Sequence, residues 1–142
     1  MMSRLIATRT WEEDMKTLAL AAIAALGFAG AALADPLEGM WRTVADDNGN
    51  SGLISVAPCG DQLCGTLIKS FDSAGAEMAS ENIGRQIIYE TVANGDGTYS
   101  GKVWSPDRDK VYNSKLVLSG DTLEVNGCVL MICRNGGTWM RQ

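Results

Sequence analysis

Histidine is missing from this chain of 142 residues. The chain therefore lacks the commonest general base of enzymes and the commonest metal ligand of proteins. Also missing from residues 35–142 is any stretch in which apolar residues keep a 3.6-residue period over three or four turns, so helix is expected to be a minor element. These absences predict no catalytic residues, no metal site and no cofactor.

The first 34 residues have the pattern of a secretory signal peptide. A short basic region at Lys16 precedes an apolar run rich in Ala and Gly, and Ala32-Leu33-Ala34 resembles a cleavage site. The run from Leu18 to Ala34 is close to the length of a transmembrane helix, which needs about 17 residues or more. Its composition and the cleavage pattern favour a signal peptide, so we expect residues 1–34 to be removed.

The expected mature chain, residues 35–142, is long enough for one compact domain with one core. It begins at Asp35 rather than at a cysteine that could be acylated, so no lipid anchor and no stable membrane span are expected after cleavage. Upstream, the acidic residues 12–14 fit neither a signal peptide nor a folded element. We therefore expect the true start of translation at Met15, and a periplasmic or secreted location for the product.

The charge balance is acidic. Of the 12 basic and 17 acidic residues, three of each lie in residues 1–34, so the net charge of −5 belongs to the expected mature chain. This balance favours solubility and makes nucleic acid and anionic membrane surfaces unfavourable partners.

Short apolar runs separated by turn-forming residues predict an all-β domain. Stretches such as "DDNGN" (46–50), "ANGDG" (93–97) and "SGD" (119–121) are typical of turns between strands. The long connection 72–84 could hold a turn or two of helix, a lid or a disordered loop. The expected strands are residues 37–44, 52–58, 63–71, 85–92, 98–104, 110–118, 122–128 and 138–142.

About eight sequential strands joined by short links either close into a barrel or fold into a sandwich. Closure removes exposed sheet edges, so we expect a small antiparallel up-and-down barrel, with a β-sandwich as the alternative. Tyr112, Leu116 and Leu118 are expected on one face of their strand, opposed by Asn113 and Lys115 on the other.

All four cysteines lie in the expected mature chain, in two pairs with the same spacing, "CGDQLC" and "CVLMIC". Residues five positions apart lie on opposite faces of a straight strand, but they become neighbours if the chain reverses between them. A turn at Asp61-Gln62 would place Cys59 opposite Cys64, and a second hairpin would pair Cys128 with Cys133, although "VLMI" is a poor turn by composition. Cross-pairing between the two hairpin ends is the alternative.

An even number of cysteines in an exported chain indicates disulfides, which leave no thiol nucleophile. A four-cysteine zinc site is the functional alternative, but structural zinc prefers two to four residues between paired ligands. The aspartates of 46–47 and 107–109 lie in expected turns, where Asp binds backbone N–H groups more often than it serves catalysis. The protein is therefore not expected to be an enzyme.

Four segments, "DPLEGMWRT" (35–43), "CGDQLCGTLI" (59–68), the stretch 101–128 and "CRNGGTWMR" (133–141), resemble the bacterial family known as domain of unknown function 2147. The resemblance implies a small exported protein of no established activity. The central stretch "AEMASENIGRQIIYETV" departs from the family pattern, in which Asn-Pro and Arg-Pro-Leu segments occur.

A second resemblance concerns architecture. Gly39-Met40-Trp41 in the first expected strand and Arg141 in the last are similar to the Gly-x-Trp and late-Arg signature of lipocalin barrels. That resemblance implies a cation-π contact of Arg141 with Trp41 at the closed end of the barrel. Arg134 is the other candidate partner of Trp41, and Trp41 as a simply buried aromatic residue is the alternative.

The segment "WSPDRDKVY" places Trp104 and Tyr112 on either side of a charged turn, where they could face a ligand or merely pack across two strands. A barrel of this size either holds one small ligand or is filled by its own side chains. The expected partner is a small apolar or amphiphilic ligand. The alternative is an envelope component that binds a filled barrel through an exposed apolar patch or an unpaired strand edge.

Overall fold

The computed structural model describes residues 33–142, and residues 35–142 form one compact unit. The expected start at Met15 and the expected signal peptide, apart from its last two residues, lie outside the described residues. The strands are β1 (Gly39–Arg42), β2 (Ser51–Cys59), β3 (Gln62–Phe71), β4 (Glu77–Met78), β5 (Gln86–Ala93), β6 (Thr98–Ser105), β7 (Lys110–Ser119), β8 (Thr122–Val129) and β9 (Ile132–Arg141).

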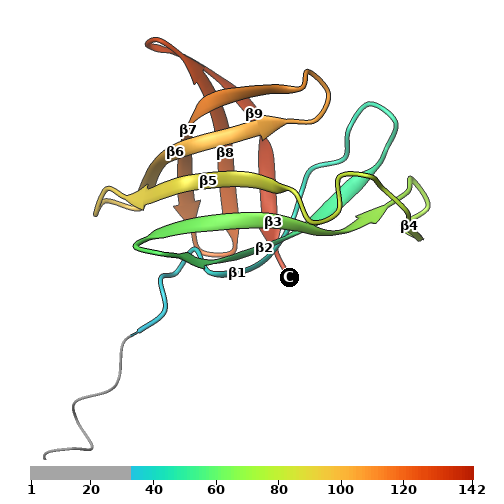
Figure 1. Cartoon of the computed structure of the whole chain (residues 1–142), viewed down its shortest axis with the longest axis horizontal. Helices are drawn as coiled ribbons and strands as arrows, with labels where there is room; N and C mark the ends of the chain where they lie inside the picture. Colours follow the sequence, from blue (N-terminus) through green and yellow to red (C-terminus); the bar gives the residue numbers. More distant parts are fainter. Residues whose placement is uncertain (1–32) are drawn as a thin grey trace, which may run out of the picture. The chain divides into compact units, whose positions relative to one another are not determined.

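Eight of these strands close into an antiparallel barrel, as the sequence predicts (Figure 1). Each of the eight pairs with the next one along the chain, and β4 lies outside this circle as a short partner of the end of β3. The circle closes where β1 meets β9, with Trp41 opposite Arg141 and Arg42 opposite Met140. The pairing joins β1 and β9, which would otherwise be edge strands, and so removes the free edges of the sheet there.

The alternation of side chains explains why the strands form. In β7, Ser114 and Leu116 are buried and face inward, whereas Asn113 and Lys115 are exposed. This period of two is the one that a half-buried strand requires.

One of the alternatives left open for the connection 72–84 is excluded, and the expected start of the last strand is wrong. The connection 72–84 forms no helix, because the Asp72 carboxylate accepts hydrogen bonds from the backbone N–H groups of Ala74 and Ala76 and holds a turn, which β4 follows. The last strand begins at Ile132 rather than at residue 138, because the second cysteine hairpin continues β8 and β9 beyond the barrel wall.

Side chains fill the barrel interior. At Gly65 the packing is so close that a Cβ atom would lie 2.6 Å from Ile88 Cγ1 and 2.9 Å from Ile54 Cγ2. An added methyl group would therefore force these side chains to move. The core consists of Leu37, Trp41, Ile54, Val56, Leu63, Leu67, Ile87, Ile88, Tyr99, Val103, Trp104, Leu116, Leu123, Val125 and Trp139.

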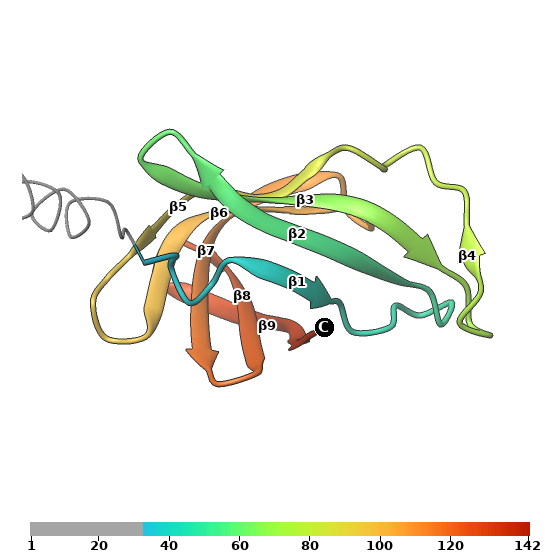
Figure 2. The same ribbon diagram turned by 90° about the horizontal axis from the view of Figure 1, so that it is seen from below.

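The turns fall at two ends of the barrel because the strands run up and down. The N-terminal end carries residues 35–38 and the turns that join β2 to β3, β5 to β6 and β7 to β8. The loop end carries the other connections, among them the β8–β9 turn, which projects at the upper left of Figure 1. Figure 2 shows β2 and β3 as a long ribbon with their turn at one end and β4 at the other.

Candidate functional site

At the N-terminal end, the guanidinium of Arg141 lies over the indole ring of Trp41, 4.3 Å from its centroid. Trp41 is fully buried, and its Nε1 donates a hydrogen bond to the carbonyl oxygen of Leu37 at 2.9 Å. Gly39 has a φ of +127°, and a Cβ atom there would lie 3.3 Å from Arg141 Nη1. A glycine two residues before the tryptophan thus suits both the backbone and the approach of the arginine.

Arg141 also binds the segment that precedes β1. Its Nη1 and Nη2 donate hydrogen bonds to the carbonyl oxygens of Glu38 at 3.2 Å and Pro36 at 2.6 Å. Its Nε lies 3.3 Å from Asp121 Oδ1. Hydrogen bonds from a charged donor are stronger than those between neutral groups. Arg141 therefore fixes residues 35–38, which we call the entry segment, onto the barrel.

Tyr99 fixes the same segment from inside the barrel. Its hydroxyl donates a hydrogen bond of 2.6 Å to Asp35 Oδ1. Burial raises the pKa of Tyr99 well above its usual value, and the hydrogen bond to Asp35 and the negative charge of this carboxylate raise it further. The N-terminal end is therefore a fixed structural contact of buried aromatic rings and one cation.

Both cysteine pairs form disulfides, Cys59 with Cys64 and Cys128 with Cys133. In the first hairpin the expected register is wrong by one residue. The turn is Gly60-Asp61 instead of Asp61-Gln62, so Cys59 lies opposite Gln62 and bonds diagonally to Cys64, with Cα atoms 5.8 Å apart. The reason is Gly60, whose φ of +68° suits the first central position of a type II′ turn.

The second disulfide joins directly opposed residues, with Cα atoms 4.0 Å apart. The two turn residues after Val129 are Leu130 and Met131, and Leu130 has a φ of +58°. The second hairpin therefore places a leucine in the conformation that Gly60 adopts in the first, where a side chain costs free energy.

Residues Val129, Leu130, Met131 and Ile132 form what we call the apolar tip. Their exposed fractions are 59%, 90%, 97% and 70%. Asn113 opposite Cys128 is the last pair between β7 and β8, so the tip projects beyond its neighbouring strand. This surface was not expected from the sequence, although an apolar pair in a position typical of Gly and Asn was the signal for it.

Trp104 and Tyr112 lie on opposite faces of the sheet. The cross-strand partner of Trp104 is Val111, and that of Tyr112 is Val103. Trp104 is 5% exposed, with Arg85 lying 3.3 Å over its ring and its Nε1 donating to Asp109 Oδ1 at 3.0 Å. The two rings do not face each other, and Arg85 covers the indole face that a ligand would need.

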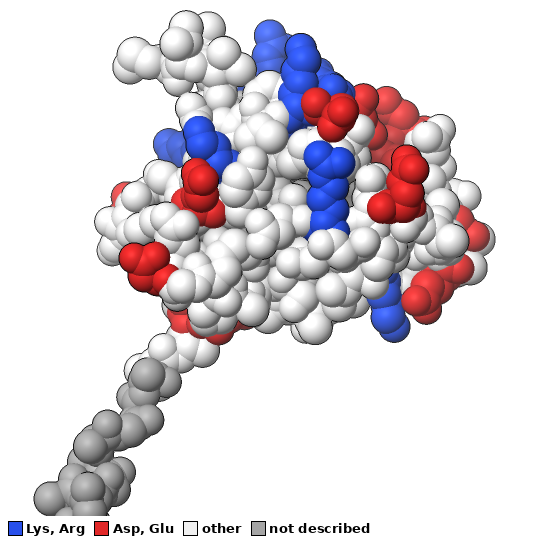
Figure 3. All heavy atoms as spheres, viewed as in Figure 1, with Lys and Arg blue, Asp and Glu red and all other residues white. Residues whose placement is uncertain are grey.

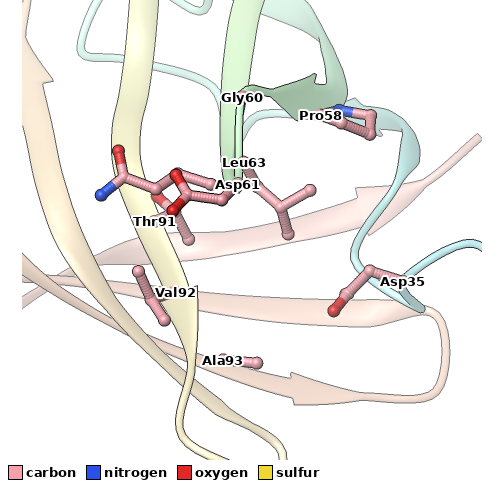
Figure 4. Close-up of a pocket in the computed structure, with 9 residues that line it drawn as sticks. Asp35, Pro58, Gly60, Asp61, Leu63, Thr91, Val92 and Ala93 are labelled. Atoms are coloured by element: carbon pink, nitrogen blue, oxygen red, sulfur yellow. The ribbon is translucent and has the colours of Figure 1, made fainter.

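A shallow depression of about 340 Å³ opens on the outside of the N-terminal end (Figure 4). Leu63 and Val92 contribute apolar surface to it, and the carboxylates of Asp35 and Asp61 lie at its margin. Thr91, also in its lining, is fully buried. The depression thus combines apolar surface with acidic groups and borders the packed core at Leu63.

Asp46 and Asp109, in two of the turns, bind neighbouring groups of the fold. Asp46 Oδ1 accepts hydrogen bonds from the N–H groups of Asn48 and Asn50, both at 2.9 Å. Asp109 accepts from Trp104 and lies 3.6 Å from Arg85 Nη2. Each of these carboxylates has a structural partner within its own region of the fold.

Within residues 33–142, no group of three or more His, Cys, Asp or Glu side chains is arranged to hold a metal ion. The same described part of the chain contains no helix long and apolar enough to cross a membrane.

Comparison with solved structures finds the same fold in a bacterial protein. Protein HP1028 from Helicobacter pylori, described as belonging to the lipocalin family, superposes with a TM-score of 0.59 at 15% sequence identity. The match covers 77% of this chain and 84% of the other. No curated protein matches the sequence. A family described as an uncharacterized protein conserved in bacteria, domain of unknown function 2147, matches residues 39–141, and the chain belongs to that family.

Proposed function

We propose that this protein is exported to the periplasm or secreted and works there as a binding protein without catalytic activity, which contacts an envelope component through its apolar tip. The observation that carries the proposal is the run of four consecutive apolar residues, 129–132, each more than half exposed. Single exposed apolar side chains are ordinary, whereas a contiguous projecting group is typical of an interaction surface.

Export is supported by the cysteines and by the start of the fold. Two disulfides form, one at each end of the barrel, and disulfides persist in oxidising compartments. The compact unit begins at Asp35, the residue that follows the expected cleavage site.

The packed core favours contact outside the barrel. A carrier of a small ligand usually encloses a cavity of several hundred cubic ångströms. Here large side chains occupy the interior positions that would line a ligand cavity. They are Trp41, Tyr99 and Trp139 at the N-terminal end, and Ile54 and Ile88 around Gly65. A filled barrel with an exposed apolar patch is the arrangement expected of an interaction protein.

Backbone strain at the tip supports the same conclusion. A leucine at a φ of +58° is less stable than a glycine would be, so the turn keeps its apolar side chain at a conformational cost. Strained positions of this kind concentrate where a side chain serves binding.

The proposal is tested by photocrosslinking in the living cell. A photoreactive amino acid replaces Met131 at the tip, and in a matched control it replaces Ile83, which is 43% exposed in another loop. We expect adducts with an envelope component from position 131 and none from position 83. No adduct at position 131, or equal adducts at both positions, would contradict a contact surface at the tip.

A second candidate is binding of a small amphiphilic molecule in the depression beside Asp61. The apolar surface of Leu63 and Val92 next to a carboxylate suits a ligand with an apolar body and a cationic group. Native mass spectrometry of the protein from a periplasmic extract tests this candidate. A mass surplus that denaturation removes and Val92→Asp abolishes would support it, and a bare mass in the wild type would rule it out for the extract used.

A further inference from the structure

We infer that the component contacted by the apolar tip is the surface of a lipid bilayer, into which the end of the β8–β9 hairpin inserts. The inference rests on the proposed function, since it names the chemistry of the partner that the tip meets. Its grounds are the shape, depth and charge of the hairpin.

The tip is convex and apolar in every direction. Val129 and Ile132 are paired, Leu130 and Met131 form the turn beyond them, and no polar side chain lies among the four. A protein partner would need a matching pocket for this wedge, whereas fluid acyl chains adapt to it. Part of the backbone groups are paired within the hairpin, and at the depth of the bilayer interface the outward-facing ones stay within reach of water and lipid headgroups.

The length of the apolar tip matches the depth of the bilayer interface. Two residue levels, the turn and the Val129–Ile132 pair, span about 7 Å at the rise of a strand, and peripheral apolar segments insert about 5–10 Å. The next level is the disulfide of Cys128 with Cys133, which fixes the two strands together. The level after it holds Arg134 opposite Gly127, where its guanidinium can reach the lipid phosphates.

Basic side chains surround the base of the hairpin. Lys102 Nζ donates to Asn113 Oδ1, and Asn113 lies directly opposite Cys128. Lys110 is exposed at the start of β7, three residues before Asn113. In Figure 3 the uncoloured projection at the upper left is the hairpin, and the charged atoms nearest to it are those of Lys and Arg.

The hairpin carries basic side chains although the net charge of the chain is −5, which by itself would disfavour an anionic membrane surface. Between Glu124 and the C-terminus, Arg134 and Arg141 are the charged side chains, and neither is acidic. The carboxylate of Glu124 accepts a hydrogen bond from Asn135, and interactions between exposed charges more than about 8 Å apart are largely screened at physiological ionic strength. The barrel body can therefore be acidic while its tip favours phosphates.

Flotation with lipid vesicles tests the inference. The oxidised protein, as the exporting cell releases it, is mixed with vesicles of phosphatidylcholine with and without phosphatidylglycerol. We expect binding to both, stronger to the second, and a loss of about tenfold or more in the double variant L130G/M131N. Arg134→Gln should weaken binding to the anionic vesicles about fivefold, and the control Ile83→Asn should bind like the wild type.

Three results would overturn the inference: no flotation of the wild type, undiminished flotation of L130G/M131N, or equal losses in this variant and Ile83→Asn. Should the double variant fold poorly, Met131→Gln, at a fully exposed position, replaces it. The proposed function has a separate outcome. Photocrosslinks from position 131 to a protein, or self-association that L130G/M131N abolishes, would keep the tip as a contact surface while excluding lipid as its partner.

Discussion

The Arg141 guanidinium lies 4.3 Å from the centre of the Trp41 ring and joins the last strand to the first. The same guanidinium also donates hydrogen bonds to the carbonyl oxygens of Pro36 and Glu38. Its loss should therefore weaken both the β1–β9 pairing, which we call the barrel seam, and the attachment of the entry segment. The contact thus joins the two ends of the barrel domain, because Glu38 and Arg141 lie 103 positions apart in the sequence.

Replacing Arg141 with Met should lower the free energy of unfolding by about 2 kcal/mol or more. A cation-π contact contributes about 0.5–2 kcal/mol, and hydrogen bonds from a charged group about 1.5–3 kcal/mol. Urea unfolding followed by tryptophan fluorescence measures the change. Arg108→Met, at an exposed loop position, is the control and should stay within about 0.5 kcal/mol of the wild type. An equally small effect of Arg141→Met would show that the contact does not stabilise the seam.

Removing either disulfide should lower the free energy of unfolding by about 2 kcal/mol, because both bonds close loops of the same short length. The two losses should add, since the bonds lie at opposite ends of the barrel. The measurement is chemical unfolding of the paired variants Cys59→Ala with Cys64→Ala, and Cys128→Ala with Cys133→Ala. Alkylation of the unfolded, unreduced wild type should label no cysteine, and labelling of all four would contradict the disulfide assignment.

The double variant L130G/M131N should be as stable as the wild type or more stable by about 1 kcal/mol. Glycine relieves the left-handed conformation of Leu130, and Gly-Asn is a favoured two-residue turn. The reciprocal variant Gly60→Leu should lose about 1–2 kcal/mol in the other hairpin, where φ is +68°. Thermal unfolding compares them. A marked loss of stability in L130G/M131N would mean that the tip packs on the barrel.

Tyr99 should make stability fall at alkaline pH. Its pKa in the folded protein is raised, so the folded state holds this proton more tightly than the unfolded state does. The stabilising effect is complete below the unfolded pKa of about 10 and is lost as the pH rises from there through the higher folded pKa. In Tyr99→Phe, the free energy of unfolding should be about 1–2 kcal/mol lower at neutral pH, because the hydrogen bond to Asp35 is lost.

The same variant should show a shallower decline above pH 10 than the wild type, by up to about 1.4 kcal/mol per pH unit. Urea unfolding at a series of alkaline pH values gives both slopes. Identical slopes in the two proteins would show that Tyr99 is not the group responsible.

The fold could be predicted from the sequence because its signals are local. Alternation in β7 and turn residues such as those of 93–97 and 119–121 gave the strands, and the spacing of the cysteines gave both disulfides. Register was less accessible, because it depends on which two residues take the turn. The turn at Gly60 lies one position earlier than the sequence predicts. The expected cysteine pair was directly opposed, whereas the pair in the structure is diagonal.

The candidate site shows the same limit more strongly. Trp104 and Tyr112 lie on either side of one turn, so a contact between them was open from the sequence. Their positions differ by one residue in register, and this difference places the two rings on opposite faces of the sheet. The apolar tip was hidden for another reason. Composition marks "VLMI" as a poor turn, and only the closed disulfide shows that the chain nevertheless turns there and exposes all four side chains.

A partner that covers the apolar tip in the cell should shield Met131, and the rate of methionine oxidation measures this protection. Met131 is 97% exposed in the turn, and Met140, 48% exposed in β9, is an internal reference. In the purified protein, peroxide should convert Met131 to the sulfoxide faster than Met140, in line with exposure. In intact cells Met131 should become protected relative to Met140. An unchanged ratio of the two oxidation rates would contradict coverage of the tip by a partner.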